Sequence, residues 1–309
     1  MFCTFSSKSK NCPANPAKRS LILVCWACIF LVLSKAQAAV NDVFPGDYVP
    51  GQAGMSAFST YLYSRELTGL YSNGQLNKSR RLRSDTSVFL TAHYFDWLNQ
   101  RMLLSLSGGW STLSMTTLTT GEVIKNSGMF DPKVSWTTWP LLNQEQGRYL
   151  SFGFSFVPGW GDYDPSLGGI NAGQNRYRGV AYLAWSSRVA KTYVLEATAE
   201  QAIYGANPNF GPNAQRLEQS PAPALTGYVR HNWRPNLSPY IGLQLNFGGE
   251  RKINGVTQED SLRSDRAMLG VRWTPAPRQI VNFRLSHDTR VDHGFKLDHE
   301  WALRWTYMY

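Results

Sequence analysis

Apolar residues recur at every second position in many short stretches of this chain. The clearest stretch is 150–156, in which every second residue is leucine or phenylalanine and the residues between are serine and glycine. Successive side chains of a β-strand point to opposite faces, so this pattern predicts a strand with one apolar and one polar face. Twelve such stretches follow one another and predict an all-β chain.

The twelve predicted strands are marked by their apolar faces. The first is ambiguous, because Phe58 and Leu62 lie on one face and Tyr61 and Tyr63 on the other. The apolar faces of the other eleven, in chain order, are Val88, Leu90, Ala92 and Tyr94; Met102, Leu104 and Leu106; Val134, Trp136 and Thr138; Leu150, Phe152, Phe154 and Phe156; Gly179, Ala181, Leu183 and Trp185; Tyr193, Leu195, Ala197 and Ala199; Leu225, Gly227 and Val229; Ile241, Leu243, Leu245 and Phe247; Leu269, Val271 and Trp273; Val281, Phe283 and Leu285; and the terminal set below.

The last strand has the strongest pattern. One face carries only aromatic and leucine side chains: Trp301, Leu303, Trp305, Tyr307 and Tyr309. A continuous aromatic face suits a barrel wall in lipid, where rings collect at the membrane boundary. It also resembles the terminal strand by which the assembly machinery recognises bacterial outer-membrane barrels. On this segment alone, a half-buried strand of a soluble sandwich is the alternative.

The connections between the predicted strands alternate in length. Those at 65–83, 114–127, 158–174, 205–221, 248–263 and 289–296 are long and rich in Gly, Asn, Asp, Ser and Pro, and those between them are short. Outer-membrane barrels combine short periplasmic turns with longer external loops. The alternation therefore predicts a transmembrane antiparallel up-and-down β-barrel of about 12 strands, with six long external loops and both termini in the periplasm.

The opposite faces of the predicted strands are polar and point into the lumen. Their charged residues have both signs on neighbouring strands, which predicts pairs that either line a solute path or simply brace the barrel. They are Arg176, Arg178, Glu196, Glu200, Arg230, Arg266, Arg272, Arg284, Asp288, Glu300 and Arg304.

The amino end reads as an export signal. Basic residues precede an unbroken apolar run, 21–33, and Ala36-Gln37-Ala38 gives a small-x-small cleavage pattern. We therefore expect residues 1–38 to be a removed signal peptide and 39–309 a single barrel domain. The signal holds all four cysteines and five basic residues but no acidic one, so the net charge falls from +10 to about +5 in the mature chain. This lower charge argues against a nucleic-acid partner.

Several spaced motifs resemble a known outer-membrane family, the MetA-pathway of phenol degradation proteins. They include Pro45-Gly46-Asp47-Tyr48, His93-Tyr94-Phe95-Asp96, Asn171-Ala172-Gly173-Gln174-Asn175-Arg176-Tyr177, Leu217-Glu218-Gln219-Ser220-Pro221 and Gly294-Phe295-Lys296. The similarity runs from about Pro45 to Tyr309. It implies a transporter-like barrel with a role in the uptake of small aromatic or hydrophobic compounds.

The sequence offers little enzymatic chemistry. In Ser286-His287-Asp288 the histidine would point away from the serine on a strand, so the three cannot form a triad. His293 and His299 show no recognised metal-ligand spacing, and we expect neither a metal nor a cofactor. The loop 159–175 is a candidate constriction that folds inward over the mouth, through Trp160, Asp162, Tyr163, Asp164, Asn171 and Asn175.

The favoured function is a narrow passive channel for small, aromatic or hydrophobic solutes, because about twelve strands leave little room inside a barrel. The partners expected with it are outer-membrane lipid and the barrel-assembly machinery. A plugged structural barrel whose loops bind a partner is the alternative, and a lipid hydrolase is a weaker one. The sequence leaves open whether solute passes through a pore or leaves sideways into the bilayer.

Overall fold

The computed structural model describes residues 42–309, all within one compact unit. The predicted signal peptide, its cysteines and its cleavage site lie outside the described residues. Within 42–309 no helix is long and apolar enough to span a membrane.

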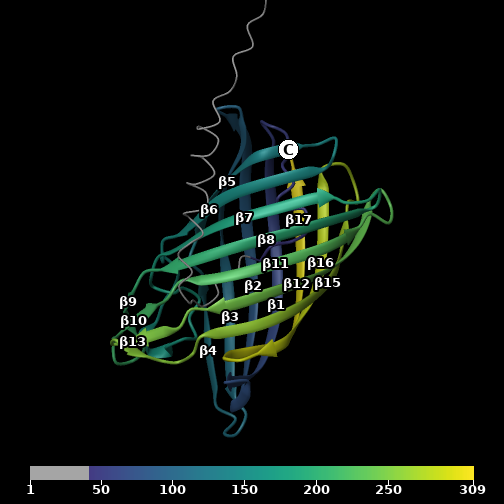
Figure 1. Cartoon of the computed structure of the whole chain (residues 1–309). Helices are drawn as coiled ribbons and strands as arrows, with labels where there is room; N and C mark the ends of the chain where they lie inside the picture. The colour runs from purple at the N-terminus through teal and green to yellow at the C-terminus, as the bar shows by residue number, and fades with distance from the viewer. Residues whose placement is uncertain (1–41) are drawn as a thin grey trace, which may run out of the picture. The chain divides into compact units, whose positions relative to one another are not determined.

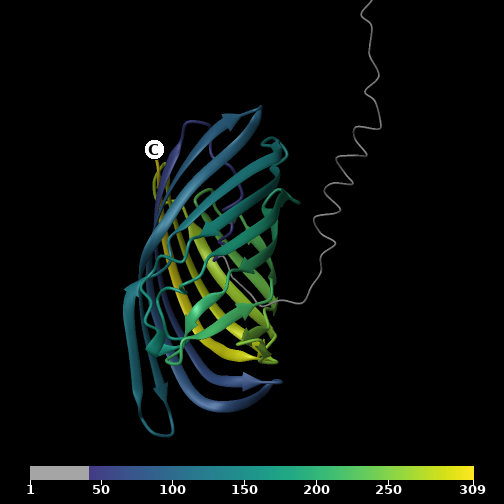
Figure 2. The same ribbon diagram turned by 90° about the vertical axis from the view of Figure 1, so that its left-hand side faces the viewer.

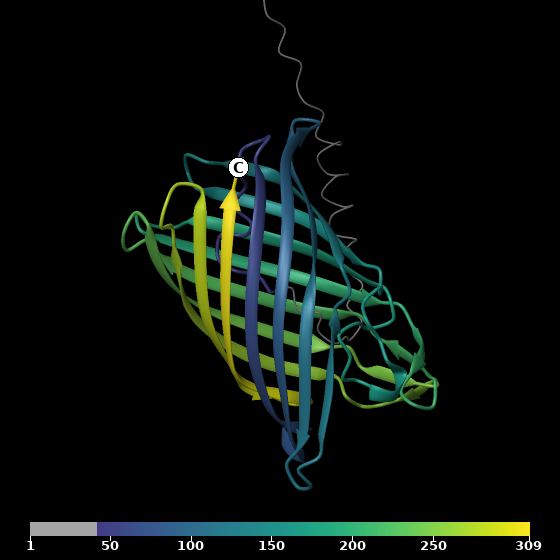
Figure 3. The ribbon, with the colours of Figure 1, turned by 180° about the vertical axis from the view of Figure 1, so that it is seen from behind.

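Twelve antiparallel strands form a closed ring (Figure 1). The ring closes because β1 pairs with β2 on one side and with the last strand, β17, on the other (Figure 3), while β2 also pairs with β3. The strands of the wall are β1 (Ser56–Ser72), β2 (Gln75–Trp97), β3 (Gln100–Thr117), β5 (Lys133–Asn143), β6 (Arg148–Val157), β7 (Arg178–Arg188), β8 (Tyr193–Tyr204), β11 (Ala222–His231), β12 (Leu237–Gly248), β15 (Leu262–Trp273), β16 (Gln279–Val291) and β17 (Gly294–Met308).

The alternation of side chains follows the predicted pattern in most of the wall. On β6 the outward Phe154 and Phe156 are 42% and 44% exposed, whereas the inward Ser151 and Ser155 are buried. On β17 the rings of Trp305, Tyr307 and Tyr309 stack along the outer surface. The predicted barrel and its strand number are therefore confirmed, and the first strand is resolved, with Phe58 and Leu62 outward.

The face predicted for the second strand was wrong. Phe89 points outward and is 51% exposed, whereas Ala92 and Tyr94 are buried inside. Val88 packs against a cluster around Phe44, and Leu90 lines an internal cavity. A row of apolar residues identifies the lipid-facing side of a strand only when the other side faces water in the lumen. Here apolar groups inside the barrel give the inner face of β2 something to pack against.

The long connections also differ from the prediction. The segment 65–83 is almost entirely β-structure, because β1 and β2 continue to a two-residue turn at Asn73-Gly74. Both turn residues have positive φ, 52° and 75°, as a tight hairpin of this kind requires. β3 likewise continues into a hairpin with β4 (Val123–Met129), which extends beyond the wall at the end opposite the C-terminus (Figure 2).

The remaining long connections carry small elements of their own. A short 3₁₀ turn, η1 (Pro165–Leu167), lies in the connection after β6. The connections 205–221 and 248–263 contribute a separate four-stranded sheet made of β9 (Asn207–Phe210), β10 (Gln215–Gln219), β13 (Arg251–Ile253) and β14 (Val256–Thr257). The small sheet covers the barrel end that lies away from the C-terminus (Figure 1).

Candidate functional site

The segment before β1 lies inside the barrel rather than outside it. We call residues 42–51 the plug. Its backbone is held by side chains from distant strands: the Tyr228 hydroxyl donates to the carbonyl of Val43 at 2.7 Å, and Trp139 Nε1 donates to the carbonyl of Tyr48 at 2.8 Å. The amide of Gly46 donates to Glu196 Oε2 at 2.6 Å. Three different strands, β5, β8 and β11, therefore hold the same short segment.

Phe44 is the apolar anchor of the plug. Its side chain is fully buried and packs with Tyr63 and Ala302. The guanidinium carbons of Arg284 and Arg304 lie 4.5 Å and 4.8 Å from its ring centroid. A cation over an aromatic ring is attracted to the negative face of the ring, and the attraction is stronger where water is excluded.

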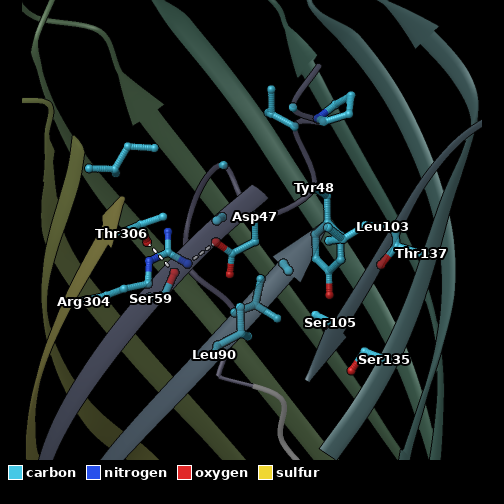
Figure 4. Close-up of a pocket in the computed structure, with 18 of the residues that line it drawn as sticks. Asp47, Tyr48, Ser59, Leu90, Leu103, Ser105, Ser135, Thr137, Arg304 and Thr306 are labelled. Atoms are coloured by element: carbon cyan, nitrogen blue, oxygen red, sulfur yellow. Dashed lines mark hydrogen bonds and ion pairs between the residues drawn. The ribbon is translucent and has the colours of Figure 1, made fainter. Parts of the chain in front are cut away.

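Two carboxylates of the plug pair with arginines of the wall. Asp42 accepts from Arg65 at 2.5 Å and from Arg284 at 3.0 Å. Asp47 pairs with Arg304, as the dashed line in Figure 4 shows. The plug is thus fixed by charge as well as by packing.

Glu300 of β17 joins this network from the wall. It is fully buried, and it accepts from Arg65 at 2.6 Å, from Arg284 at 2.8 Å and from Ser286 at 2.8 Å. Because Arg65 and Arg284 also bind Asp42, the two carboxylates share two cations. A buried charge requires such compensation.

Most of the predicted lumen charges are held in pairs of this kind. Besides Arg284 with Glu300 and Arg304 with Asp47, Arg230 pairs with Glu196 at 3.0 Å and Arg266 with Asp288 at 2.7 Å. These residues point inward as predicted, but they brace the wall and hold the plug.

The other four predicted lumen residues are not in these pairs. Glu200 is buried in β8, and Arg272 packs against Gly46 of the plug. Arg178 is the first residue of β7, and Arg176 lies just before it, at the barrel end away from the C-terminus.

A cavity of about 330 Å³ adjoins the plug, and we call it the lumen cavity. On its plug side are Asp47, Tyr48 and Arg304 (Figure 4). Its far side is made by inward residues of β2, β3 and β5, which are apolar or carry hydroxyl groups except for Lys133 at the start of β5. They include Leu90, Ala92, Tyr94, Leu103, Ser105, Ser135 and Thr137. Burial raises the pKa of the Tyr48 hydroxyl well above its usual value, so Tyr48 stays neutral beside the cavity.

The loop 159–175 bridges two edges of the opposite barrel end. Asp162 accepts from the amide of Met129 in β4 at 2.7 Å, and the Tyr163 hydroxyl donates to the carbonyl of Asn209 in β9 at 3.1 Å. Asp131 fixes both ends of the loop, because it accepts from the amides of Gly161 and Gln174.

The predicted constriction residues have different places in this loop. Asn171 accepts from the amide of Asp164 at 2.7 Å, and Asn175 donates to Asn207 at 3.0 Å. Trp160 is 74% exposed, and it lines neither the lumen cavity nor the cavity beneath this loop.

Beneath this loop is a second cavity of about 600 Å³, which we call the mouth cavity. The loop contributes Tyr163, Ile170 and Asn171 to its lining, and the extended part of β2 contributes Arg80 and Leu82. Arg176 lines it as well.

The serine, histidine and aspartate of 286–288 are separated as predicted. Ser286 and Asp288 are buried inside the barrel, whereas His287 is exposed on the other face. Ser286 is bound to Glu300, and Asp288 to Arg266. Within 42–309 no group of three or more His, Cys, Asp or Glu is placed to hold a metal ion.

Sequence reasoning missed the plug, although a signal for it was visible. Pro45-Gly46-Asp47-Tyr48 stood out as a motif, but it lies before the first strand and shows no periodicity that would place it inside the ring. It also missed Arg65 and Arg80, because both lie in a segment predicted to be a loop.

A closed antiparallel ring with an outer apolar band and a charged interior defines a transmembrane β-barrel. The chain belongs to the family described as "Putative MetA-pathway of phenol degradation", whose profile matches residues 43–303. The match begins within the plug, so the plug is part of what the family shares with this chain.

Solved structures show the same fold. An outer membrane channel from Pseudomonas putida F1 superposes with a TM-score of 0.81 at 20% identity, covering 87% of this chain and 100% of that one. The β domain of the Bordetella autotransporter BrkA has a TM-score of 0.56 at 12% identity, covering 84% of this chain and all of its own. Comparison with curated proteins gave no significant match.

Proposed function

We propose that this protein is a narrow passive channel of the outer membrane for small aromatic or hydrophobic compounds. The observation that carries the proposal is the apolar row on the inner face of β2 and β3. Leu82 faces the mouth cavity, Val88 packs near the plug, and Leu90 and Leu103 face the lumen cavity. Apolar side chains at these points lower the cost of removing an apolar solute from water there.

The size of the path fits small solutes. The lumen cavity of about 330 Å³ lies at the low end of the range of roughly 300–1,000 Å³ seen for small-molecule sites. The plug occupies the charged side of the lumen, so solute would pass on the apolar side, past Tyr48. The family description, which refers to phenol degradation, supports the same solute class.

The rest of the proposal concerns the envelope. Residues 1–38 would direct export and be removed, and both ends of the mature chain would face the periplasm. The aromatic face of β17 would be read by the barrel-assembly machinery, so removal of Tyr309 should lower the amount of folded barrel in the outer membrane. We propose no enzymatic step.

The test is transport by protein purified from outer membranes. Reconstituted into liposomes, it should admit phenol, and Leu103→Gln should slow that uptake. Leu104→Gln is the matched control, because Leu104 is the next residue and faces outward, 50% exposed. Equal uptake by the two variants would remove the apolar path from the proposal.

A plugged structural barrel is the second candidate, and the plug itself favours it. Single-channel recording in planar bilayers separates the two. A channel should show discrete openings that phenol or toluene reduces. If the wild-type protein and all variants show no current and no phenol uptake, the structural barrel is favoured.

We also propose that the loop 159–175 narrows the mouth. Asp131→Ala removes the acceptor that holds both ends of the loop, so the single-channel current should rise. An unchanged current would remove the constriction from the proposal.

A further inference from the structure

The mouth cavity has an unusual balance of charge. Its lining holds three arginines, Arg80, Arg176 and Arg251, and neither aspartate nor glutamate. Arg251 is compensated outside the cavity, because Asp260 accepts from its Nε at 2.5 Å. Two cationic side chains remain to be explained.

Arg80 comes from the extended part of β2 and has a weak partner. Its guanidinium lies 3.8 Å from the sulfur of Met115, a poor acceptor, and among the described residues it forms no ion pair with a carboxylate. The adjacent Arg81 differs, since it lies on the other face of the strand and pairs with Glu66 at 3.1 Å.

Arg176 enters the cavity from the opposite side, at the end of the loop. Its direct contacts are neutral: it donates to Gln219 and to Gln174, and its guanidinium carbon lies 4.5 Å from the ring centroid of Tyr204. Its Nη1 is buried without a hydrogen-bond partner among the described residues.

The setting of Arg176 makes its charge costly. Burial is the main cause that lowers the pKa of the Arg176 guanidinium to about 10. The charges of Arg178 and Arg251 add to this, whereas Tyr204 and Asp131 act in the opposite direction. A bound anion would relieve both the burial cost and the repulsion, because hydrogen bonds between ionised groups are the strong ones.

The rest of the lining is apolar and comes from several elements. It includes Leu82, Met115, Phe210, Leu217 and Phe295. An inorganic anion would leave this surface in contact with water. An anion with an apolar body would cover it while its charged group reached the arginines.

We propose that the mouth cavity is a capture site for small organic carboxylates with an aromatic body, held by Arg80 and Arg176. The inference extends the proposed function, because it names the chemical class of solute that the channel takes up first. The uncharged inner face of β2 runs from Leu82 to Leu90 at the lumen cavity, so a captured solute lies at the start of the proposed path.

Equilibrium dialysis of the detergent-solubilised protein against labelled benzoate tests the site without any need for transport. Benzoate should bind saturably, and acetate and benzyl alcohol, which lack the ring and the charge respectively, should each bind about 10-fold more weakly or worse. Chloride should compete. Binding of acetate or of benzyl alcohol as tight as that of benzoate would overturn the proposal.

Two variants and one control place the site. Arg80→Gln and Arg176→Gln should each weaken benzoate binding about 10- to 100-fold. Arg81→Gln should leave it unchanged, because that side chain faces away. A shift in gel mobility on heating shows that each variant is folded. If Arg176→Gln does not fold, Arg80→Gln and the chloride competition still decide the matter.

The outcome is separate from that of the channel. Phenol uptake without benzoate binding would remove the capture site and keep the channel. Benzoate binding that depends on Arg80, without phenol uptake, would keep the site and remove the channel.

Discussion

On the inner face of β16 and β17, Arg284, Asp288, Glu300 and Arg304 are all buried and all paired. Two strands along the wall, beyond β1, the inner face of β2 from 82 to 94 is leucine, serine, threonine, valine, leucine, alanine and tyrosine, without a charge. The charged side holds the plug, and the uncharged side faces the lumen cavity (Figure 4).

The difference separates two roles of lumen residues, which are to hold the plug and to contact solute. Polar residues inside a barrel suggest contact with a polar solute. Here the charged groups are paired with one another, with Arg266 of β15 and with the plug. The side that remains free for solute is the apolar one, which makes the comparison between the two sides open to direct test.

The largest effect should come from Glu300. Glu300→Ala leaves Arg65 and Arg284 in the lumen without their shared wall carboxylate, and breaking a buried pair typically costs about 3–5 kcal/mol. Urea unfolding of the purified barrel, followed by tryptophan fluorescence, measures the loss.

Glu66→Ala is its matched control. Glu66 lies on the outer face and pairs with an exposed arginine, so its removal should cost less than about 1 kcal/mol. Similar losses for the two variants would show that the charged side of the lumen is not what holds the barrel.

Phe44→Ala tests the plug separately from the wall. Truncation of a fully buried phenylalanine costs about 3–5 kcal/mol, and here the cost falls on docking of the plug, since the strand ladder does not include Phe44. Protease should then cut the plug, and the single-channel current should rise. Phe58→Ala, on the outer face, should do neither, and a protease-resistant plug in the Phe44 variant would contradict the anchor role.

Glu196→Gln should have a smaller effect of the same kind. Its oxygens accept from Gly46 of the plug and from Arg230 of the wall, and hydrogen bonds to a charged group are worth about 1.5–3 kcal/mol. We expect partial exposure of the plug to protease, less than with Phe44→Ala. If Glu196→Gln exposes the plug to protease as fully as Phe44→Ala does, the charged contacts hold the plug at least as strongly as the packing of Phe44.

The smallest effect on stability should lie on the uncharged side. Leu90 borders an existing cavity, so Leu90→Ala should cost less than the roughly 2–5 kcal/mol of a leucine truncation in a packed core. Phenol uptake should nevertheless change, because the solute path is altered. A loss above that of Glu196→Gln, with unchanged uptake, would mean that Leu90 serves packing alone.

The faces of the wall strands could be predicted from the sequence where no apolar group inside the barrel packs against the strand. On β6 and β17 the outward rings and the small or polar inward residues obey one simple rule, and both were predicted correctly. On β2 the same rule pointed to the wrong face, because Val88 packs against the cluster around Phe44 and Leu90 borders a cavity that the plug lines.

Two further features needed information that periodicity does not hold. The pair Asn73-Gly74 is a hairpin signal, but the segment 65–83 was predicted to be a loop from its Gly, Asn and Ser content, and Arg80 was missed with it. The predicted charges of β15 to β17 were found inside the barrel. Their partners in the plug could not be inferred, because no local pattern connects Asp47 with Arg304.

The position of the plug before the first strand has a consequence for the order of folding. Asp42 binds Arg284 and Asp47 binds Arg304, contacts that join residues 242 and 257 positions apart. Contacts between such distant positions carry a large loop-closure entropy until the intervening strands have paired. We expect the newly closed ring to be empty at first, and the amino-terminal segment to enter it as the last step of maturation.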